Sequence, residues 1–391
     1  MLKVSVAHSL ELDTSDAVEE VLHQCHEQFG VLKPDAGLLF TGIDHDHQLI
    51  LKRINEVYSG IELIGCTTFG ELSSVHGVTD DSIVLLLFFS DEITFKAGVA
   101  ESISKDATNS IKKALKSAKS NLNDDPAMCL ILPNTSAGTG EVTAFVDLED
   151  LIQGIHQGLG DSFPVFGGCA GDPNWFGGCQ YYKDSVLTDA APFFMISGSL
   201  LFSLGISAGW MPIGKKTKIT HAQKNTIFKI GDLSALDFYK HYLGEFDFLG
   251  VVEYPLAVFE NEGDNFYLRA PTFFDSEKGS MSFMATIPEG STVQLTHATR
   301  DKTINGVEMS VNSALSKYPG SNPSLALCFT CMARKMVLGT RVQEEYHLLK
   351  KHFPNLPIAG FYTGGEIGPL DSGKPTRYHN ETFLTLLMGI E

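Results

Sequence analysis

The chain contains one short pattern three times: a strand-like apolar run, a glycine-rich turn and an acidic residue close behind. The three copies are residues 61–71, 163–172 and 356–366. Glycine allows the backbone to adopt φ > 0 or to lie very close to another segment or a ligand. A repeated unit indicates a fold built from copies, so we expect the three turns to share one surface.

The residues around each copy predict a strand, a helix and a second strand that leads into the glycine turn. Short apolar runs indicate the strands, and apolar residues at helical spacing indicate the helices. The expected strand and helix pairs are 37–41 with 44–58, 127–132 with 146–159, and 324–329 with 341–353. The composition turns polar near residues 215–224. The sequence therefore predicts an α/β (mixed α+β) fold whose repeated strand–helix–strand units form two packed domains, residues 1–215 with two internal repeats and residues 216–391.

The middle of the chain predicts a different succession of elements. We expect a helix over 232–243 and strands over 251–259, 266–269, 282–287 and 292–298. Just before them, residues 190–214 carry no charge, and about 20 apolar residues can span a bilayer. Ser197-Gly198-Ser199 interrupts that run, and such a turn favours a hairpin of two strands, 193–196 and 200–208. We therefore expect no membrane span.

The charge and cysteine content limit the partners and the compartment. The net charge is −18. Nucleic acids and anionic membranes attract clustered lysine and arginine, so neither is an expected partner. Seven cysteines are an odd number in a long chain and indicate no dense disulfide framework. Reduced thiols are typical of the cytoplasm, where we expect this protein.

Several short motifs, in order along nearly the whole chain, resemble FIST proteins, which have an N-terminal FIST domain and a FIST C-domain. They are Ile64-Gly65-Cys66-Thr67, Pro164-Val165-Phe166-Gly167-Gly168, Tyr254-Pro255-Leu256-Ala257, Ile287-Pro288-Glu289-Gly290-Ser291, Cys331 with Arg334, Gly360-Phe361-Tyr362-Thr363 with Gly365-Glu366, and His379-Asn380 with Thr382. The resemblance implies an intracellular sensor of small ligands. One free-standing branch, NosP, binds haem b, senses nitric oxide and modulates a histidine kinase or a cyclic-di-GMP enzyme. The resemblance implies a partner of that kind, and a homodimer is left open.

The glycine turns are themselves candidates for binding a small zwitterion. Their backbone amides suit a carboxylate, and Glu366 suits an ammonium group. Arg334 follows a predicted strand and could hold a carboxylate in a bidentate pair. The alternative is structural: the glycines allow tight strand packing, the glutamate caps a turn, and His379 bonds a backbone carbonyl. The candidate ligand-binding residues are Gly65, Cys66, Gly167, Gly168, Arg334, Gly364, Gly365, Glu366, His379 and Asn380.

Haem, which the resemblance implies, would need an axial side chain, most often histidine, and an apolar slot. His241 is the first candidate because its predicted helix region is rich in aromatic residues, and His297, at the end of a predicted strand, is the second. The alternative for His241 is an ordinary amphipathic helix with a half-exposed histidine. The aromatic neighbours of His241 in the sequence are Phe238, Tyr242, Phe246 and Phe248.

A catalytic function is the third hypothesis. Cys66 or Cys169 at a glycine turn could act as a nucleophile, but the sequence contains no G-x-S-x-G, P-loop or H-E-x-x-H motif. We therefore expect a non-enzymatic sensor. Haem with nitric oxide is the leading ligand, an amino-acid-like molecule without haem is the alternative, and a cysteine-dependent hydrolase is the most distant one.

Overall fold

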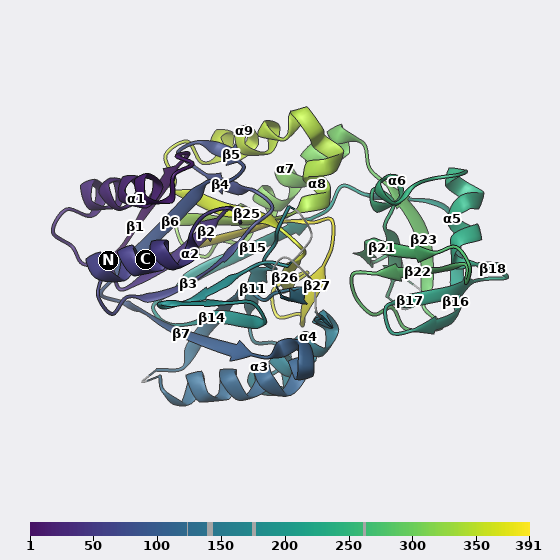
Figure 1. Cartoon of the computed structure of the whole chain (residues 1–391), viewed down its shortest axis with the longest axis horizontal. Helices are drawn as coiled ribbons and strands as arrows, with labels where there is room; N and C mark the ends of the chain where they lie inside the picture. Colours follow the sequence, from purple (N-terminus) through teal and green to yellow (C-terminus); the bar gives the residue numbers. More distant parts are fainter. Residues whose placement is uncertain (123, 139–143, 174–176, 261–262) are drawn as a thin grey trace.

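The computed structural model describes residues 1–122, 124–138, 144–173, 177–260 and 263–391. Three six-stranded sheets with helices on their outer side form the body of the protein. Residues 211–297 form a smaller unit, here called the insert, which lies beside the body (Figure 1). The predicted mixed α/β fold of repeated units is therefore confirmed.

Three units with the same order of elements build the body. The first is β1 (Leu2–Ser9), α1 (Thr14–Phe29), β2 (Ala36–Thr41), α2 (His47–Val57), β3 (Glu62–Thr67), β4 (Glu71–Ser73), β5 (Gly77–Thr79) and β6 (Ile83–Ser90). The second is β7 (Ile93–Glu101), α3 (Ile103–Ser120), β8 (Pro126–Ile131), α4 (Leu148–Leu159), β11 (Val165–Gly168), β12 (Gln180–Tyr182), β13 (Ser185–Leu187) and β14 (Ala190–Gly198), with the small hairpin β9 (Ser136–Ala137) and β10 (Ala144–Phe145).

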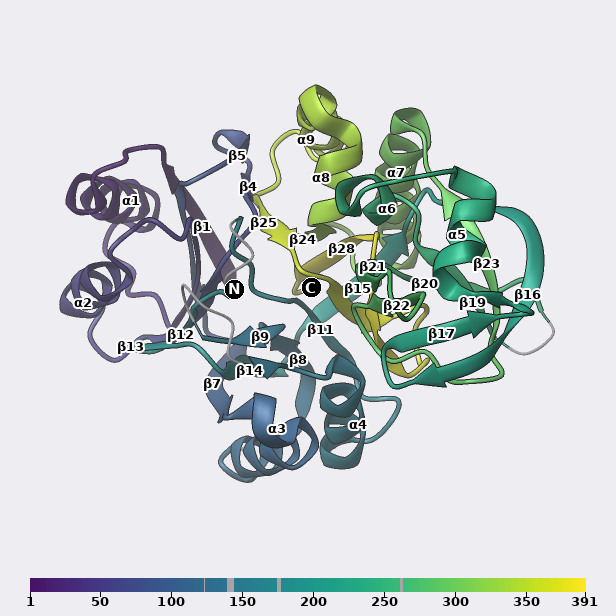
Figure 2. The same cartoon turned by 45° about the vertical axis from the view of Figure 1, so that its right-hand side comes forward.

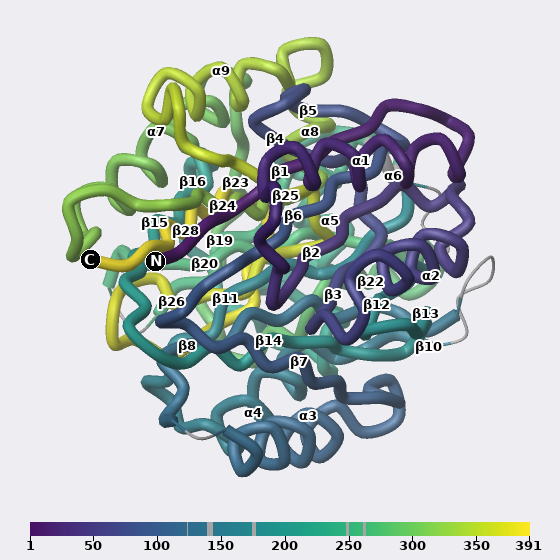
Figure 3. The backbone as a smooth tube through the Cα atoms, turned by 90° about the vertical axis from the view of Figure 1, so that its left-hand side faces the viewer, coloured from purple at the N-terminus to yellow at the C-terminus, as the bar shows by residue number. Residues whose placement is uncertain are grey.

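The third unit has the same order but is interrupted after its first strand. Its elements are β15 (Leu201–Ser207), α7 (Arg300–Lys317), β24 (Leu325–Cys331), α8 (Met332–Leu338), the 3-10 turn Gly339–Arg341, α9 (Gln343–His352), β25 (Ile358–Thr363), β26 (Glu366–Pro369), β27 (Thr376–His379) and β28 (Phe383–Gly389). The helix pairs α1/α2, α3/α4 and α7/α9 occupy three corners of the body (Figures 2 and 3).

Each sheet is completed by a hairpin that comes from another unit. The strand orders are β1-β6-β2-β3-β12-β13, β7-β14-β8-β11-β26-β27 and β15-β28-β24-β25-β4-β5. The first unit thus gives β4–β5 to the third, the third gives β26–β27 to the second, and the second gives β12–β13 to the first. This exchange closes on itself, so no unit has a complete sheet without its neighbour.

Each repeated turn begins with a glycine at which two parallel strands approach each other closely. Gly65, Gly167 and Gly360 lie opposite Leu39, Ile131 and Cys328 respectively. A Cβ atom on these glycines would lie 2.1, 1.8 and 1.8 Å from the carbonyl oxygen opposite. Only glycine fits there. For Gly65 and Gly167, the structure therefore supports the packing alternative over ligand binding.

The predicted helices next to the glycine turns are present as α2, α4 and α9. The opening elements of the first and third units, β1, α1 and α7, were not predicted. For α7 the reason is local, because its buried side consists largely of small residues such as Gly306, Ser310 and Ala314. A Cβ on Gly205 of β15 would meet the Ser310 carbonyl oxygen at 1.8 Å. This tight packing replaces the large apolar residues that make a helical period visible.

Two predictions about single elements were wrong. The strands that flank Gly198 form no hairpin with each other: β14 pairs with β7 and β8, whereas β15 pairs with β28 in a different sheet. Because the two strands belong to different sheets, the segment Ser197-Gly198-Ser199 connects one sheet to the other. The strand expected over 251–259 begins only at Leu256, because the helix α6 (Phe248–Val252) precedes it. Asp247 caps that helix by accepting the Gly250 N–H.

The insert consists of one curved sheet with two helices. Its elements are β16 (Met211–Gln223), β17 (Thr226–Ile230), β18 (Leu233–Ser234), α5 (Ala235–Leu243), α6 (Phe248–Val252), β19 (Leu256–Phe259), β20 (Phe266–Arg269), β21 (Pro271–Asp275), β22 (Ser280–Phe283) and β23 (Thr292–His297). It leaves and rejoins the body through β16 and β23, where Met211 pairs with His297. The division predicted between residues 215 and 216 falls inside β16, and the chain after the insert returns to the body.

Candidate functional site

The three glycine turns meet in a closed ring of backbone hydrogen bonds. In each turn one backbone N–H donates to a carbonyl oxygen of a neighbouring turn, and the residue that accepts this bond donates its own N–H back. The bonds are Phe69 to Tyr362 (2.9 Å), Gly171 to Thr67 (2.9 Å), Gly364 to Cys169 (3.2 Å), Tyr362 to Gly70 (2.8 Å), Thr67 to Cys179 (3.0 Å) and Cys169 to Gly365 (2.9 Å). The ring therefore already uses the Gly364 amide that we expected to bind a ligand carboxylate.

The first turn ends in a buried cluster of hydrogen bonds around Glu71, which we call a clasp. The Thr68 hydroxyl donates to one carboxylate oxygen of Glu71 (2.5 Å). The backbone N–H and the hydroxyl of Ser82 donate to the other oxygen (3.1 and 2.7 Å). Three donors thus hold a carboxyl group that is 0% exposed.

The third turn repeats this clasp atom for atom around Glu366. Thr363 donates to one oxygen of Glu366 (2.6 Å), and the N–H and hydroxyl of Thr382 donate to the other (3.1 and 2.5 Å). The Gly365 N–H, in turn, donates to the Thr363 hydroxyl oxygen (2.9 Å). Glu366 is also 0% exposed. The predicted contact between Glu366 and a ligand ammonium is therefore wrong, because this carboxyl group is enclosed by the protein itself.

Burial has the largest effect on the pKa of the carboxyl group in each clasp. It raises the pKa of Glu71 to about 7 and that of Glu366 to about 8, against the opposing effect of their hydroxyl and N–H donors. Burial and the neighbouring Glu366 also raise the pKa of Glu381 well above its usual range. The clasps are thus buried acids whose charge state affects the stability of the ring.

The second unit has lost its clasp. In its sheet, Gln180 lies opposite Cys66, the residue that follows Gly65 on β3. Glu71 and Glu366 likewise lie opposite the residue that follows the repeated glycine in their sheets. The same strand register puts alanine, Ala170 and Ala190, where the other two units have their hydroxyl residues. The acid and both hydroxyl groups are therefore replaced together, as expected if they act as one group.

The second turn is also longer. The segment from Ala170 to Gln180 has eleven residues, whereas the corresponding segments 68–71 and 363–366 have four residues each. Asp172, which the sequence suggested as the acid of the second copy, belongs to this longer segment. The repeat is thus interrupted at two places, the second turn and the insert.

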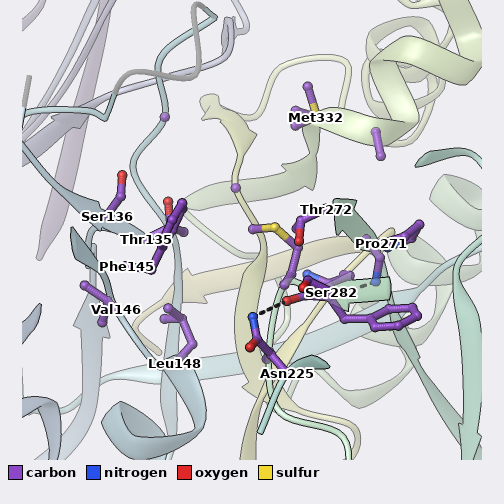
Figure 4. A pocket seen from close by; sticks show the side chains of 18 of the residues that line it. Thr135, Ser136, Phe145, Val146, Leu148, Asn225, Pro271, Thr272, Ser282 and Met332 are labelled. Carbon is purple, nitrogen blue, oxygen red and sulfur yellow. Dashed lines mark hydrogen bonds between the residues drawn. The ribbon is translucent and has the colours of Figure 1, made fainter. Parts of the chain in front are cut away.

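Both interruptions face one cavity of about 760 Å³ between the body and the insert. Figure 4 shows the body wall, with Thr135, Phe145 and Leu148, opposite the insert wall, with Pro271 and Thr272. The ring residues Phe69, Gly171 and Gly364 also line it. The other described lining residues are Ser136, Val146, Asp147, Ala170, Asp172, Gly177, Gly178, Lys224, Asn225, Val252, Ala270, Phe273, Ser282, Phe283, Met284, Ala285, Thr286, Cys331, Met332, Ala333 and Asn380.

Comparison with protein families matches residues 35–232 to the FIST N domain and residues 235–369 to the FIST C domain. The chain belongs to the FIST family. FIST domains are sensor domains of signal transduction that bind small ligands. The boundary between the two matched regions lies within the insert, so the cavity of this FIST protein involves residues from both.

The relatives of this FIST chain carry no assigned activity. An uncharacterized protein of Methanocaldococcus jannaschii is 24% identical over 79% of this chain, which spans 63% of that relative's length. An uncharacterized protein of Mycobacterium tuberculosis is 23% identical over 94% of this chain and 95% of its own length. Among solved structures, a cyanuric acid hydrolase from A. caulinodans aligns over 100% of this chain and 99% of its own with 9% identity and a TM-score of 0.42. None of the described helices is long and apolar enough to cross a membrane.

Two of the ten predicted ligand-binding residues of this FIST chain, Gly364 and Asn380, line the cavity. The Asn380 side-chain oxygen accepts the Ala270 N–H of the insert (3.2 Å), so it also joins the two walls. His379 is buried and lies 2.8 Å from the Gly368 carbonyl oxygen through Nε2. Burial lowers its pKa to about 4, so it is neutral. His379 therefore bonds a backbone carbonyl, as the structural alternative proposed, and this bond links the paired strands β26 and β27.

Arg334 joins segments of the body that lie next to the insert in the chain, and it does not bind a ligand carboxylate. Its guanidinium is 0% exposed and donates to Glu345 (2.7 Å). It also donates to the carbonyl oxygens of Ala208 (2.5 Å) and Thr303 (2.7 Å). Those two residues lie on the chain just before and just after the insert. The predicted role as a carboxylate clamp for a ligand is therefore wrong, because the protein supplies all these acceptors.

The two candidate haem ligands lie away from the cavity. His241 is exposed on α5, where its ring lies edge-on to Tyr242 with 5.0 Å between centroids. His297 lies at the attachment of the insert, paired with Met211. The side chain of Phe248 lies outside the described part of the chain. No histidine is present among the described lining residues of the cavity. Haem held by His241 or His297 would therefore lie outside this cavity.

The cysteines proposed as nucleophiles are enclosed in the body. Cys66 and Cys169 are both 0% exposed and do not line the cavity. Burial raises the pKa of both thiols well above the usual range. A thiol that stays protonated is a weak nucleophile.

Proposed function

We propose that this FIST protein is a non-enzymatic sensor whose small organic ligand binds in the cavity between the body and the insert. One observation carries the proposal: the three-unit repeat is interrupted at two places, and both interruptions face this cavity. Departures from an otherwise regular scaffold are where proteins place function. A cavity of this size between two structural units is also the usual form of a small-molecule site.

The walls favour a ligand that is largely apolar and not anionic. The surface of the cavity is mostly apolar, and phenylalanine, valine, leucine, methionine and proline side chains contribute to it. The charged lining residues are two carboxylates, Asp147 and Asp172, and one exposed lysine, Lys224. Hydroxyl and amide groups from Thr135, Ser136 and other residues can accept or donate hydrogen bonds. This composition supports neither an amino acid held by Glu366 and Arg334 nor any other ligand defined by its negative charge.

The same helix touches the cavity and the attachment of the insert, which provides a route for a signal. Met332 and Ala333 at the start of α8 line the cavity, and Arg334 follows at once with its bonds to Ala208 and Thr303. A ligand that contacts both walls would change how the insert sits on the body. We propose that a partner protein reads this change, and the family resemblance suggests a histidine kinase or a cyclic-di-GMP enzyme.

Filling the cavity tests its role as the ligand site. Thr272 is half-buried on the insert wall, so Thr272→Trp places an indole in the space that a ligand would use. A thermal-shift screen of a metabolite library against the full chain would identify ligands. We expect each of them to lose at least about tenfold in affinity, or about 1.4 kcal/mol, in Thr272→Trp.

The control is Thr220→Trp, an exposed position on β16 of the same insert that does not line the cavity. It should bind every ligand as the unaltered protein does. Ligands whose affinity is the same in all three proteins would show that the cavity is not the site.

A haem titration tests separately whether His241 or His297 is an axial haem ligand. If haem is taken up, we expect its Soret band, and any shift of that band with nitric oxide, to be unchanged in His241→Ala and His297→Ala. The reason is that neither side chain reaches the cavity. Absorption titrations of the three proteins check this, and loss of the band in either variant would restore the histidine-ligated haem hypothesis.

A further inference from the structure

Two phenylalanines that line the cavity have side chains exposed to solvent. Phe145 on β10 of the body is 81% exposed, and Phe273 on β21 of the insert is 62% exposed. In the described part of the chain they are the only phenylalanines with exposed side chains, although the sequence has 26. Both line the same cavity. Exposed aromatic rings lose the benefit of burial, so their position on opposite walls of one cavity suggests that something else covers them.

The surroundings of the two rings extend the same apolar character into the cavity. Val146 and Leu148 follow Phe145 on the body wall, and Phe283 and Met284 lie near Phe273 on the insert wall. Met332 of α8 also lines the space between the walls (Figure 4). Thioether side chains make favourable contacts with aromatic rings and adapt to their shape.

We propose that Phe145 and Phe273 are specificity-determining residues that enclose a flat, uncharged aromatic ligand between the body and the insert. This inference rests on the proposed function and adds the ligand class. A planar ligand offers its faces to rings from both walls, and ring stacking favours it over a rounded molecule of similar size. The two carboxylates in the lining disfavour an anionic ligand, and the hydroxyl groups of Thr135 and Ser136 suit a single polar substituent.

The experiment uses the full chain and Nile red, a flat and uncharged dye whose fluorescence reports an apolar site. We expect saturable binding of one dye per chain. Phe145→Ala and Phe273→Ala should each weaken it by about tenfold, whereas Phe273→Tyr should keep it. Both rings are exposed, so their removal should leave the melting temperature nearly unchanged. Leu12→Ala, at a position 82% exposed and away from the cavity, is the matched control.

Competition by two alcohols tests the shape of the ligand. Phenanthrene-9-methanol is flat and 1-adamantanemethanol is rounded, and both are neutral. We expect only the flat alcohol to displace Nile red. Equal displacement by both, or full affinity in the two Phe→Ala variants, would overturn the proposed ligand class.

The Thr272→Trp variant separates this inference from the proposed function. If Thr272→Trp abolishes Nile red binding while the two Phe→Ala variants keep it, the cavity remains the site and only the ligand class is wrong. If Nile red binds equally to Thr272→Trp, or shows no saturable binding, both proposals fail.

Discussion

Replacing Arg334 by methionine is expected to lower the free energy of unfolding by about 3–5 kcal/mol, the usual result of removing one partner of a buried ion pair. The substitution leaves Glu345 buried with a negative charge and without its guanidinium. It also removes the guanidinium that donates to the Ala208 and Thr303 carbonyl oxygens and so ties the body segments before and after the insert to α8. Urea unfolding followed by circular dichroism measures the loss.

Two further variants show whether the loss comes from the unpaired charge. Arg53→Met removes an arginine that pairs with Glu19 on the surface, and it should cost no more than about 1 kcal/mol. The double variant Arg334→Met/Glu345→Leu removes both charges and should recover part of the stability. A double variant that is less stable than Arg334→Met alone would contradict this account.

Stability should fall as the pH rises through the range set by Glu366. Its folded pKa of about 8 lies above the ordinary value of 4.5, so the folded protein binds this proton more tightly than the unfolded chain does. The contribution of Glu366 is therefore most favourable below about pH 4.5 and is lost progressively up to about pH 8. At about 1.4 kcal/mol per pKa unit, the loss is on the order of 5 kcal/mol.

Glu366→Gln should remove most of this pH dependence and make the protein more stable than the unaltered chain above pH 8. The side-chain oxygen of a glutamine can still accept the two bonds from Thr382, while its amide group faces the Thr363 hydroxyl, which can accept. Urea midpoints between pH 5 and 9 test this. Glu71→Gln should give a smaller change, ending near pH 7. Exposed Glu277→Gln is the control, and parallel pH profiles for Glu366→Gln and the unaltered protein would show that Glu366 does not titrate in this range.

The sequence was most informative where a local requirement recurs. Gly65, Gly167 and Gly360 recur because each must let a neighbouring carbonyl oxygen approach, and that requirement is visible as a repeated pattern. The strand before each glycine and the helix before that strand were found with it. The units were nevertheless assigned too short, because β1, α1 and α7 lie far from the glycine pattern, and α7 packs through small residues.

The candidate site was predicted only in part. Glu366 and Arg334 were recognised as residues with a special role, but a sequence does not show whether the partner of a charged group is a ligand or the protein. In the fold, Thr382 and Glu345 supply those partners. Gly364 and Asn380 do line the cavity. Phe145 and Phe273 gave no signal, because exposure cannot be read from a single phenylalanine in an apolar stretch.

The sequence by itself determined the repeated architecture, the family and the positions where backbone packing admits only glycine. These depend on contacts that each unit makes in the same way, so they appear as regular patterns along the chain. The tertiary structure alone decided the exchange of hairpins, the ring of turns and the cavity. Their parts come from segments more than a hundred residues apart, such as Phe69, Gly171 and Gly364, and hydrogen bonds between such segments leave no periodic trace in a single sequence.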